Sequence, residues 1–435
     1  MEKGIKKALI ITYYWPPGGG AGVQRWLKFV KYLRDYGWEP VVYTPENPEY
    51  PEIDESLLKD IPLNLTVIKQ PIREPYKAYK RFIGQDKEKK IQTAFLTEDK
   101  KPRFTERIAV WIRGNFFIPD ARKFWIKPSV KYLISYLKEH PVDAIITTGP
   151  PHSMHLIGLK LHQKLFIPWL ADFRDPWTNI DFYNELMLTK TADRKHRKLE
   201  KQVLKTATWV SVISPSMAEN FNSLYSRQYE VITNGYDPED INTSGMVKLD
   251  QKFSIAHIGS LVKTRNPKVL WKVLSEIITN QPEFASDLEI KLVGKMDIIA
   301  KEDLDKYKLW QYVNKIDYLP HDEVVNVQQQ SQVLLLLIND SPNAKMILTG
   351  KFFEYMASKR PILCIGPVDG NAAVILKETN TGKISGFEDS KTLKGHILDY
   401  YNQYKAGKLE LENTSIEKYS RKSLTKRIIE VIDQK

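Results

Sequence analysis

"ALIITYYWPPGGGAGVQRWLKFVKYLRDYG", residues 8–37, joins a short apolar run, a loop rich in glycine and proline, and a segment with the periodicity of an amphipathic helix. Glycine lacks a Cβ and accepts positive φ, so such a loop can bring backbone N–H groups against a ligand at a helix N-terminus. The pattern predicts a β-strand, a loop that approaches a phosphate or a sugar, and a helix that is capped near Gly37. A glycine turn without a ligand is the alternative.

The glycine spacing argues against a dinucleotide site. The fingerprint G-x-G-x-x-G needs a third glycine three residues after the second, and that position after Gly18 and Gly20 is Val23. Other frames through Gly19 and Gly22 fail in the same way. The sequence therefore disfavours NAD as a ligand.

Composition is that of a globular protein with more than one core. The chain has 435 residues, of which 42% are hydrophobic and 27% charged, and this predicts two domains. The single cysteine, Cys364, permits no internal disulfide, which favours a reducing compartment such as the cytoplasm. The net charge of +12 predicts attraction to an anionic partner: nucleic acid, a lipid surface or a phosphorylated substrate.

Neither a signal peptide nor a membrane span is indicated. The N-terminal apolar stretch stops at Trp15 and Pro16 without a small-residue cleavage site, so we interpret it as a strand. The longest apolar run, residues 333–338, is far below the roughly 20 residues that cross a bilayer.

Short apolar runs alternate with helical patterns, which predicts parallel sheets in an α/β fold. The strand candidates in the first half are residues 8–12, 40–43, 144–147, 169–171, 209–213 and 230–232. In the second half they are residues 254–258, 289–293, 333–338 and 361–365. We place the joint between the two α/β units near residues 237–252.

Three segments follow from this division. We expect a first domain over residues 1–240, a second over 241–412, and a C-terminal helical segment over 413–435 that packs on the two domains. Ile428, Ile429 and Ile432 share one side of that helix. Residues 73–106 have many charges and few apolar positions, which predicts an insertion or a flap.

The second unit has two candidate ligand-binding segments. In "HIGSLVKTRNPKVLWKVL" a strand ends at Gly259, and Lys263 and Arg265 precede a helix, which is a phosphate-binding arrangement. Two solvated cations in a loop are the alternative. In "TGKFFEYMASKRPIL", Gly350 and Lys351 begin a helix and Glu354 lies one turn later. That carboxylate either binds a ribose or favours the helix dipole.

The first unit has candidate acceptor residues at strand ends, where open α/β sheets bind ligands. His152 in "TTGPPHSMHLIGL" is interpreted as a sugar-contacting or proton-handling residue, or as a structural cap, and His155 as a packed residue. "DFRDPW" supplies Asp172, Arg174 and Asp175. They either contact the acceptor or form an Asp–Arg pair that fixes the loop.

Residues 103–131 combine charge with aromatic side chains. The stretch has seven Lys or Arg, two acids and six Phe or Trp. It favours reversible attachment to an anionic membrane surface over nucleic-acid binding, because no recognition motif accompanies the charge. A solvated helix with a buried aromatic side is the alternative.

The order of "YYWPPGGGAGVQR", "DFRDPW", "VISPSM", "VITNGYD", "HIGSL", "KLVGK" and "KFFEYMASKRPIL" resembles the glycosyltransferase family 4 type of sugar-nucleotide-dependent enzymes. The resemblance covers nearly the whole chain. It implies two Rossmann-like domains in the GT-B architecture, with an interdomain cleft to which the Gly-rich loop contributes. The donor is then a nucleoside diphosphate sugar, and no metal ion or other cofactor is required.

The resemblance also implies roles for particular residues. Glu354 accepts hydrogen bonds from two ribose hydroxyls, and Lys263 and Arg265 neutralise the diphosphate. The residues implied or inferred for the donor are Gly259, Lys263, Arg265, Gly350, Lys351 and Glu354, those for the acceptor are Gly19, Gly20, Arg25, His152, Asp172 and Arg174, and those for catalysis are His152, Lys263 and Arg265. The family usually has a second acid eight residues before the ribose-binding one, and that position is Met346 here. This departure leaves the sugar and the anomeric outcome open.

We therefore expect a transferase that moves a sugar from a nucleoside diphosphate to a hydroxyl of a surface glycan or a lipid-linked saccharide. The expected location is the cytoplasm, with peripheral attachment to the inner face of the membrane and no nucleic-acid partner. A nucleotide-sugar epimerase of similar fold and a non-catalytic saccharide- or nucleotide-binding protein are the alternatives.

Overall fold

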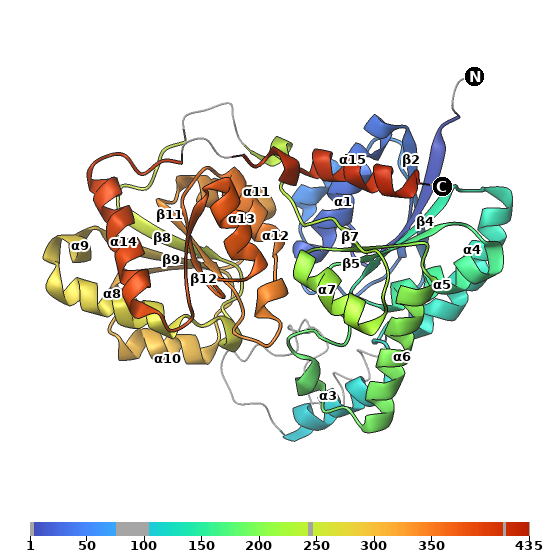
Figure 1. Ribbon diagram of the computed structural model, residues 1–435, viewed down its shortest axis with the longest axis horizontal. Helices are drawn as coiled ribbons and strands as arrows, with labels where there is room; N and C mark the ends of the chain where they lie inside the picture. The colour runs from blue at the N-terminus through green and yellow to red at the C-terminus, as the bar shows by residue number, and fades with distance from the viewer. Residues whose placement is uncertain (1–3, 75–103, 242–246, 412–414, 435) are drawn as a thin grey trace. The chain divides into compact units, whose positions relative to one another are not determined.

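The computed structural model describes residues 4–74, 104–241, 247–411 and 415–434, and the chain forms two compact units (Figure 1). The described part of unit 1 consists of residues 4–74, 104–233 and 421–434, and that of unit 2 lies within residues 234–420. Most of the segment 73–106, which we expected to be an insertion or a flap, lies outside the described residues.

The chain passes from unit 1 to unit 2 after Thr233, whereas we expected the first domain to reach residue 240. The carbonyls of Ile232 and Thr233 accept hydrogen bonds from buried Arg25 in unit 1. The side-chain amide of Asn234 instead donates to the carbonyl of Leu348 in unit 2, at 3.0 Å. Thr233 is therefore hydrogen-bonded within unit 1, and the next residue, Asn234, within unit 2.

Unit 1 contains a parallel sheet of seven strands in the order β3-β2-β1-β4-β5-β6-β7. The strands are β1 (Lys6–Ile11), β2 (Trp38–Pro45), β3 (Thr66–Gln70), β4 (Ala144–Gly149), β5 (Trp169–Phe173), β6 (Trp209–Val212) and β7 (Glu230–Val231). The central strands β4 and β5 are buried along their whole length. Parallel strands covered by helices on both faces are expected to be apolar throughout.

The helices of unit 1 are α1 (Ala21–Leu33), α3 (Phe104–Phe116), α4 (Lys123–Glu139), α5 (Ser153–Leu165), α6 (Lys190–Thr206), α7 (Pro215–Leu224) and α15 (Arg421–Ile432). Gly20, at φ +86°, precedes α1, and Gly37, at φ +77°, ends the 3₁₀ turn that follows it. Both positions need the left-handed region that glycine enters without strain. The predicted strand and the helix that ends near Gly37 are thus confirmed, and the ligand of the loop stays a prediction.

Unit 2 contains a parallel sheet of six strands in the order β10-β9-β8-β11-β12-β13. The strands are β8 (Phe253–Ile258), β9 (Leu288–Val293), β10 (Val313–Ile316), β11 (Val333–Leu337), β12 (Ile362–Ile365) and β13 (Gly382–Ser385). Two apolar clusters cover its two faces: Ile255 and Leu335 belong to one, and Ala256 and Leu334 to the other. Alternate residues of one strand therefore serve opposite cores.

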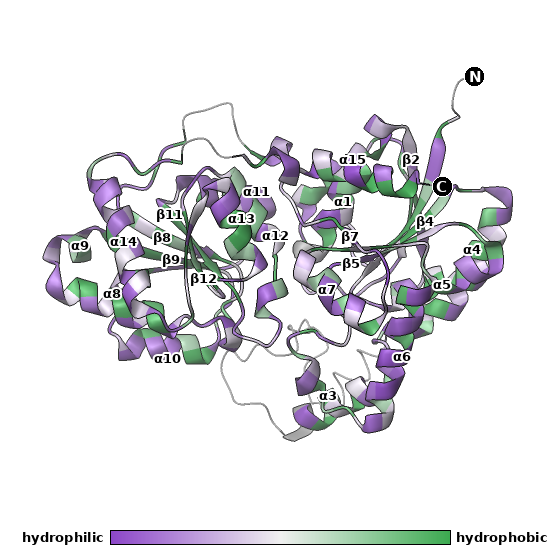
Figure 2. Cartoon of the chain, viewed as in Figure 1, coloured by the Kyte–Doolittle hydropathy of each residue, from purple (hydrophilic) through white to green (hydrophobic). Residues whose placement is uncertain are grey.

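The helices of unit 2 are α8 (Lys268–Asn280), α9 (Pro282–Asp287), α10 (Ile298–Lys306), α11 (His321–Gln330), α12 (Gly350–Ala357), α13 (Asn371–Thr379) and α14 (Ser390–Lys405). Figure 2 shows the hydrophobic colour along the strands and a mixed pattern on the helices, as expected for amphipathic helices that cover a sheet. The predicted α/β class with two Rossmann-like sheets is confirmed. Within the described ranges, none of the helices combines the length and the apolarity that a bilayer span needs.

The C-terminal helix α15 belongs to unit 1, where it packs on α1. Ile428, Ile429 and Ile432 are buried in the same apolar cluster as Val30. The predicted packing side of this helix is confirmed. We expected residues 413–435 to pack on both domains; the short turn at Glu417–Tyr419 lies in unit 2 and α15 in unit 1.

Candidate functional site

The carboxyl end of β8 carries a cluster of cationic and polar side chains in unit 2. Gly259, at φ +122°, turns the chain out of the strand, and Arg265 follows in a 3₁₀ turn, Lys263–Arg265. The guanidinium of Arg265 donates from Nη1 to the carbonyl of Ser260 at 3.0 Å and from Nε to Oδ1 of Asn339 at 2.8 Å. Because Asn339 follows β11, these bonds fix Arg265 between two neighbouring strand ends.

Lys351 brings a second cation to the same place. It lies in the first turn of α12, and its Nζ donates to the carbonyl of Ile258 at 3.1 Å. A Cβ on Gly259 would lie 3.1 Å from this nitrogen, so glycine leaves room for the ammonium. Burial, and then the charge of Arg265, hold the pKa of Lys351 well below its usual 10.5, while Glu354 acts in the opposite direction. The two cations are therefore close enough to oppose each other's charge.

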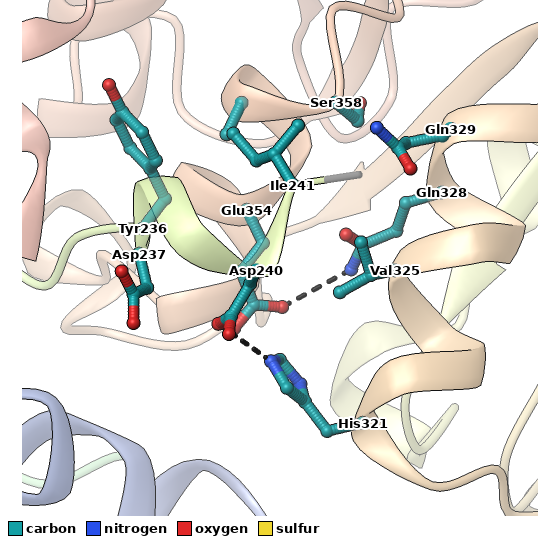
Figure 3. Close-up of a pocket in the computed structure, with 11 residues that line it drawn as sticks. Tyr236, Asp237, Asp240, Ile241, His321, Val325, Gln328, Gln329, Glu354 and Ser358 are labelled. Carbon is teal, nitrogen blue, oxygen red and sulfur yellow. Dashed lines mark hydrogen bonds and ion pairs between the residues drawn. The ribbon is translucent and has the colours of Figure 1, made fainter. Parts of the chain in front are cut away.

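Glu354 lies one turn further along α12 and lines a small pocket in unit 2 (Figure 3). Nε2 of Gln328 on α11 donates to Oε2 of Glu354 at 3.2 Å. On the same side of the pocket, Nε2 of His321 lies 3.0 Å from a carboxylate oxygen of Asp240. The structure thus brings Arg265, Lys351 and Glu354 together, as the donor prediction requires.

Two further residues singled out in the sequence are Lys263 and Met346. The side chain of Lys263 is exposed and has no hydrogen bond or ion pair with the residues that the structure describes. Its predicted role at the diphosphate stays a prediction, but it lacks the fixed geometry of Lys351. Met346 ends the 3₁₀ turn Ala344–Met346, directly before the segment that leads into α12.

The Gly-rich loop of unit 1 is held by backbone hydrogen bonds. The N–H of Gly18 donates to the carbonyl of Trp15, and the N–H of Gly19 donates to the carbonyl of Glu52 at 3.0 Å. Gly20 directly precedes α1 and offers it no side-chain cap. Two glycines were predicted to contact the acceptor. The N–H of Gly19 is already used in a hydrogen bond, and Gly20 is the N-cap residue of α1.

Arg25 and Asp172, predicted at the acceptor, are instead the buried centre of unit 1. Each side chain is 1% exposed, and they form an ion pair of 2.7 Å. The carboxylate of Asp172 also accepts hydrogen bonds from Trp26, Thr148 and Ser211. Burial alone would raise the pKa of Asp172, but the charge and hydrogen bonds of Arg25 and the bonds from Trp26 and Ser211 lower it to about 2. This geometry corrects the acceptor assignment of both residues, because their polar atoms are buried and already bonded within unit 1.

Arg174 ties together two loops at the carboxyl edge of the sheet. Nη1 donates to the carbonyl of Gly22 at 3.1 Å, and Nη2 donates to the carbonyl of Pro150. The guanidinium lies over the ring of Tyr14 at 5.7 Å. Its Nε is buried and has no hydrogen-bond partner among the described residues. Arg174 thus fixes the loop.

His152 precedes α5 and is buried against the indole of Trp177, with ring centroids 4.7 Å apart and planes 1° apart. Burial, and then the neighbouring His155, hold its pKa well below 6.5, so the ring is neutral. Nδ1 has no partner within the described part of the chain. His152 is the N-cap residue of α5, as the structural alternative has it, but its side chain makes no cap hydrogen bond.

His155 is packed, as predicted. Its Nδ1 lies 2.9 Å from Oγ1 of Thr147, which also accepts a hydrogen bond from the indole of Trp169. A Cβ on Gly149 would lie only 2.5 Å from Nε2 of His155 and 3.0 Å from Nδ1 of His152. Because Gly149 has no side chain, both imidazoles can pack closely against the backbone at this strand end.

We expect His155 to make unit 1 less stable in acid. Its pKa falls from 6.5 to about 3 on burial, so below pH 6.5 the unfolded chain binds a proton that the folded chain does not. The free energy of unfolding should then drop by about 2 kcal/mol between pH 7 and pH 5 through this residue. Urea unfolding of the native protein and of His155→Asn at both pH values measures the difference. An equal pH dependence in both proteins would contradict the assignment.

Asn339, Gln328 and Trp177 were missed at the level of the sequence. Asn339 follows the buried run of β11, so the preference of ligand-binding residues for strand ends could have indicated it. Trp177 stands inside the quoted motif "DFRDPW" but gives no local sign of stacking on His152. Gln328 lies inside a helix, and no pattern in the sequence marks it.

Residues 87–240 match the family model described as Glycosyltransferase Family 4. The match covers about a third of the chain, and the two Rossmann-like sheets are those of the GT-B fold. Among curated proteins, no sequence matches it.

Solved structures resemble the chain over almost its whole length. Sucrose-phosphate synthase from Thermosynechococcus elongatus has a TM-score of 0.63 at 13% identity, with 99% of this chain and 98% of that chain covered. WaaG, a glycosyltransferase involved in lipopolysaccharide biosynthesis, has a TM-score of 0.59 at 12% identity, with 99% and 100% covered. A variant of S. aureus TarM, in complex with fondaparinux, α-GlcNAc-glycerol and UDP, has a TM-score of 0.60 at 11% identity, with 99% and 100% covered. At these identities the likeness establishes the shared fold.

Proposed function

We propose that the protein is a glycosyltransferase that moves a sugar from a nucleoside diphosphate sugar to a hydroxyl group of a surface glycan or a lipid-linked saccharide. The observation that carries the donor assignment is the cluster of Arg265, Lys351 and Glu354 in unit 2. Two cations and one carboxylate on neighbouring strand and helix ends fit a ligand with a diphosphate and a ribose.

The cluster suits the charge that develops in the reaction. When the glycosidic bond to the diphosphate breaks, the leaving nucleoside diphosphate gains negative charge, and positive groups fixed at that point lower the barrier. Arg265 and Lys351 are held by hydrogen bonds before any ligand binds. The first turn of α12 has no side-chain cap, so the N–H groups of Gly350 and Lys351 can add to the anion site. We propose that these groups carry the charge without a metal ion.

On the acceptor side we propose His152 and Arg174. Each has a buried ring or guanidinium nitrogen without a partner among the described residues, at the carboxyl edge of the sheet in unit 1. A neutral imidazole can accept the proton of an acceptor hydroxyl, and stacking on Trp177 fixes the plane of the ring. Arg174 Nε can donate to an oxygen of the acceptor.

We propose that the enzyme works in the cytoplasm, at the inner face of a membrane. Its net charge of +12 and the basic, aromatic stretch at residues 103–131 support peripheral attachment to anionic lipid. Arg122 in that stretch is nearly buried and paired with Glu74 at 3.1 Å, so this residue does not contribute an exposed charge. A lipid-linked acceptor would then share one surface with the enzyme.

Thermal unfolding in the presence of nucleoside diphosphates and their sugars tests the donor class. A ligand at 100 times its dissociation constant adds about 2.7 kcal/mol of stability, which is readily measured. Release of nucleoside diphosphate that rises with a saccharide acceptor would support transfer. Isomerisation of the donor would indicate an epimerase, and binding without turnover would indicate a binding protein.

Replacing Glu354 with alanine is expected to weaken donor binding by tenfold or more. Two charge-assisted hydrogen bonds to ribose hydroxyls are at stake, each worth roughly 1.5 to 3 kcal/mol. Isothermal titration with the stabilising nucleoside diphosphate measures the loss. Glu302→Gln, which removes an exposed charge from α10 in the same unit, is the matched control. Unchanged affinity in a folded Glu354→Ala protein would refute the ribose assignment.

A further inference from the structure

Helix α6 presents a continuous cationic stripe to solvent. Because successive residues in a helix are about 100° apart, six exposed basic residues fall within an arc of about 100°. They are Lys190, Arg194, Arg197, Lys198, Lys201 and Lys205. The opposite side packs into unit 1 through Ala192, His196, Glu200, Val203 and Leu204. The helix is thus anchored by one face and charged on the other.

The acids of α6 leave most of this charge uncompensated. Asp193 pairs with Arg197 at 3.0 Å. Glu200 is buried, and it accepts hydrogen bonds from the backbone of Trp177 and from the backbone and hydroxyl of Thr178. It therefore points into the core rather than toward the stripe.

Exposed aromatic rings lie on the neighbouring helices α3 and α4. Trp111, Phe116 and Phe124 are 39%, 59% and 52% exposed. Nζ of Lys123, at the start of α4, lies 5.1 Å from the ring of Phe124. Nζ of Lys123 also donates to the carbonyl of Phe116 at the end of α3, which places the aromatic start of α4 beside the end of α3.

The end of α3 is fastened to the start of α6, so these elements form one rigid support. The backbone N–H of Thr189, which caps α6, donates to Oδ1 of Asn115 at 2.7 Å. Nδ2 of Asn115 donates to the carbonyl of Met187 at 3.2 Å. A Cβ on Gly114 would lie 2.8 Å from the carbonyl oxygen of Leu186, so the backbones meet closely here.

We propose that the stripe on α6, together with Trp111, Phe116, Lys123 and Phe124, is the surface by which unit 1 docks on an anionic lipid bilayer. We name these residues the α6 surface. The proposal rests on the membrane location proposed above and assigns most of the attachment to residues outside 103–131. Phosphate groups of anionic lipids complement the stripe, while aromatic rings settle at the boundary between headgroups and acyl chains. A nucleic-acid backbone would satisfy the charges but would leave the exposed rings without an apolar partner.

Sedimentation with vesicles tests the α6 surface. The native protein should bind vesicles of phosphatidylcholine with phosphatidylglycerol at low salt, ignore pure phosphatidylcholine, and be released as ionic strength rises. Each basic residue near an anionic surface contributes about fivefold to the partition constant, so the triple variant Arg194→Gln, Lys198→Gln, Lys201→Gln should bind about a hundredfold more weakly. Thermal unfolding checks that this variant is folded.

A matched triple variant tests whether vesicle binding depends on the stripe of α6 or only on the total charge of the protein. Lys272→Gln, Lys377→Gln, Lys391→Gln removes the same charge from exposed positions of unit 2 and should bind vesicles like the native protein. An equal loss in both triple variants would overturn the α6 surface. Native-like binding by the α6 variant would overturn it as well and leave the membrane location standing. If the native protein ignores anionic vesicles, or binds only duplex DNA, both proposals fall, while donor turnover remains a separate measurement.

Discussion

Replacing Asp172 with asparagine is expected to lower the free energy of unfolding of unit 1 by about 3 to 5 kcal/mol. The substitution keeps the shape of the side chain but leaves the guanidinium of Arg25 buried without its anionic partner, and breaking a buried pair in this way has that cost. Arg25 also donates to the carbonyls of Ile232 and Thr233, so the end of unit 1 should loosen with it. Hydrogen exchange of the amides in α1 and β5 measures the loss for unit 1 alone.

Two controls show whether burial is the cause. Asp193→Asn removes one partner of the half-exposed pair with Arg197 in the same unit and should cost less than about 1 kcal/mol. The double variant Arg25→Met, Asp172→Asn should be more stable than Asp172→Asn alone, because no unpaired charge remains buried. If Asp172→Asn and Asp193→Asn lower the free energy of unfolding equally, burial does not make the Arg25–Asp172 pair more stabilising than the exposed pair.

The sequence predicts the central strands of both sheets but not three strands at the edges. β3, β10 and β13 were missed, and each lies at the edge of its sheet. Their burial is partial and irregular, so they lack the continuous apolar run that marks a strand covered on both faces. Edge strands take their conformation largely from the neighbouring strand, and this pairing is not written in the local pattern.

The same limit applies to Arg25 and Asp172. Both stand at positions where a ligand-binding residue would stand, after the Gly-rich loop and at a strand end, and the sequence cannot show that they meet each other. They are 147 residues apart in the chain, so only the parallel order of the strands brings them together. The alternative that an Asp–Arg pair fixes the loop was closer, although the partner of Asp172 is Arg25 rather than Arg174.

In unit 2, local pattern was more informative. Arg265, Lys351 and Glu354 were predicted from a strand end and a helix start, and the fold brings those two segments to one place. What the pattern did not reveal is which cation is fixed. Lys263 and Arg265 are two residues apart in one turn, yet only Arg265 is bonded to a neighbouring strand end through Asn339.

Replacing Lys351 with methionine is expected to lower turnover of the nucleoside diphosphate sugar by about a hundredfold or more. Removing one fixed donor from the charge that develops in a transition state has an effect of this order. Steady-state release of nucleoside diphosphate measures it, with the donor saturating so that kcat is observed. Lys263→Met is the matched control and should cost less than tenfold, since that ammonium is exposed and unfixed.

The thermal stability of Lys351→Met should not fall along with its turnover. This difference separates a catalytic role of Lys351 from a structural one. The ammonium of Lys351 is partly buried near the guanidinium of Arg265, and both burial and that charge disfavour its protonated form. Methionine keeps the length of the side chain without the charge, so Lys351→Met should unfold at the same temperature as the native protein or higher, while turnover falls. A group that costs stability in the free enzyme is held in place for a ligand. If Lys351→Met instead loses stability and retains turnover, the lysine supports the fold and the diphosphate assignment passes to Arg265 and Lys263.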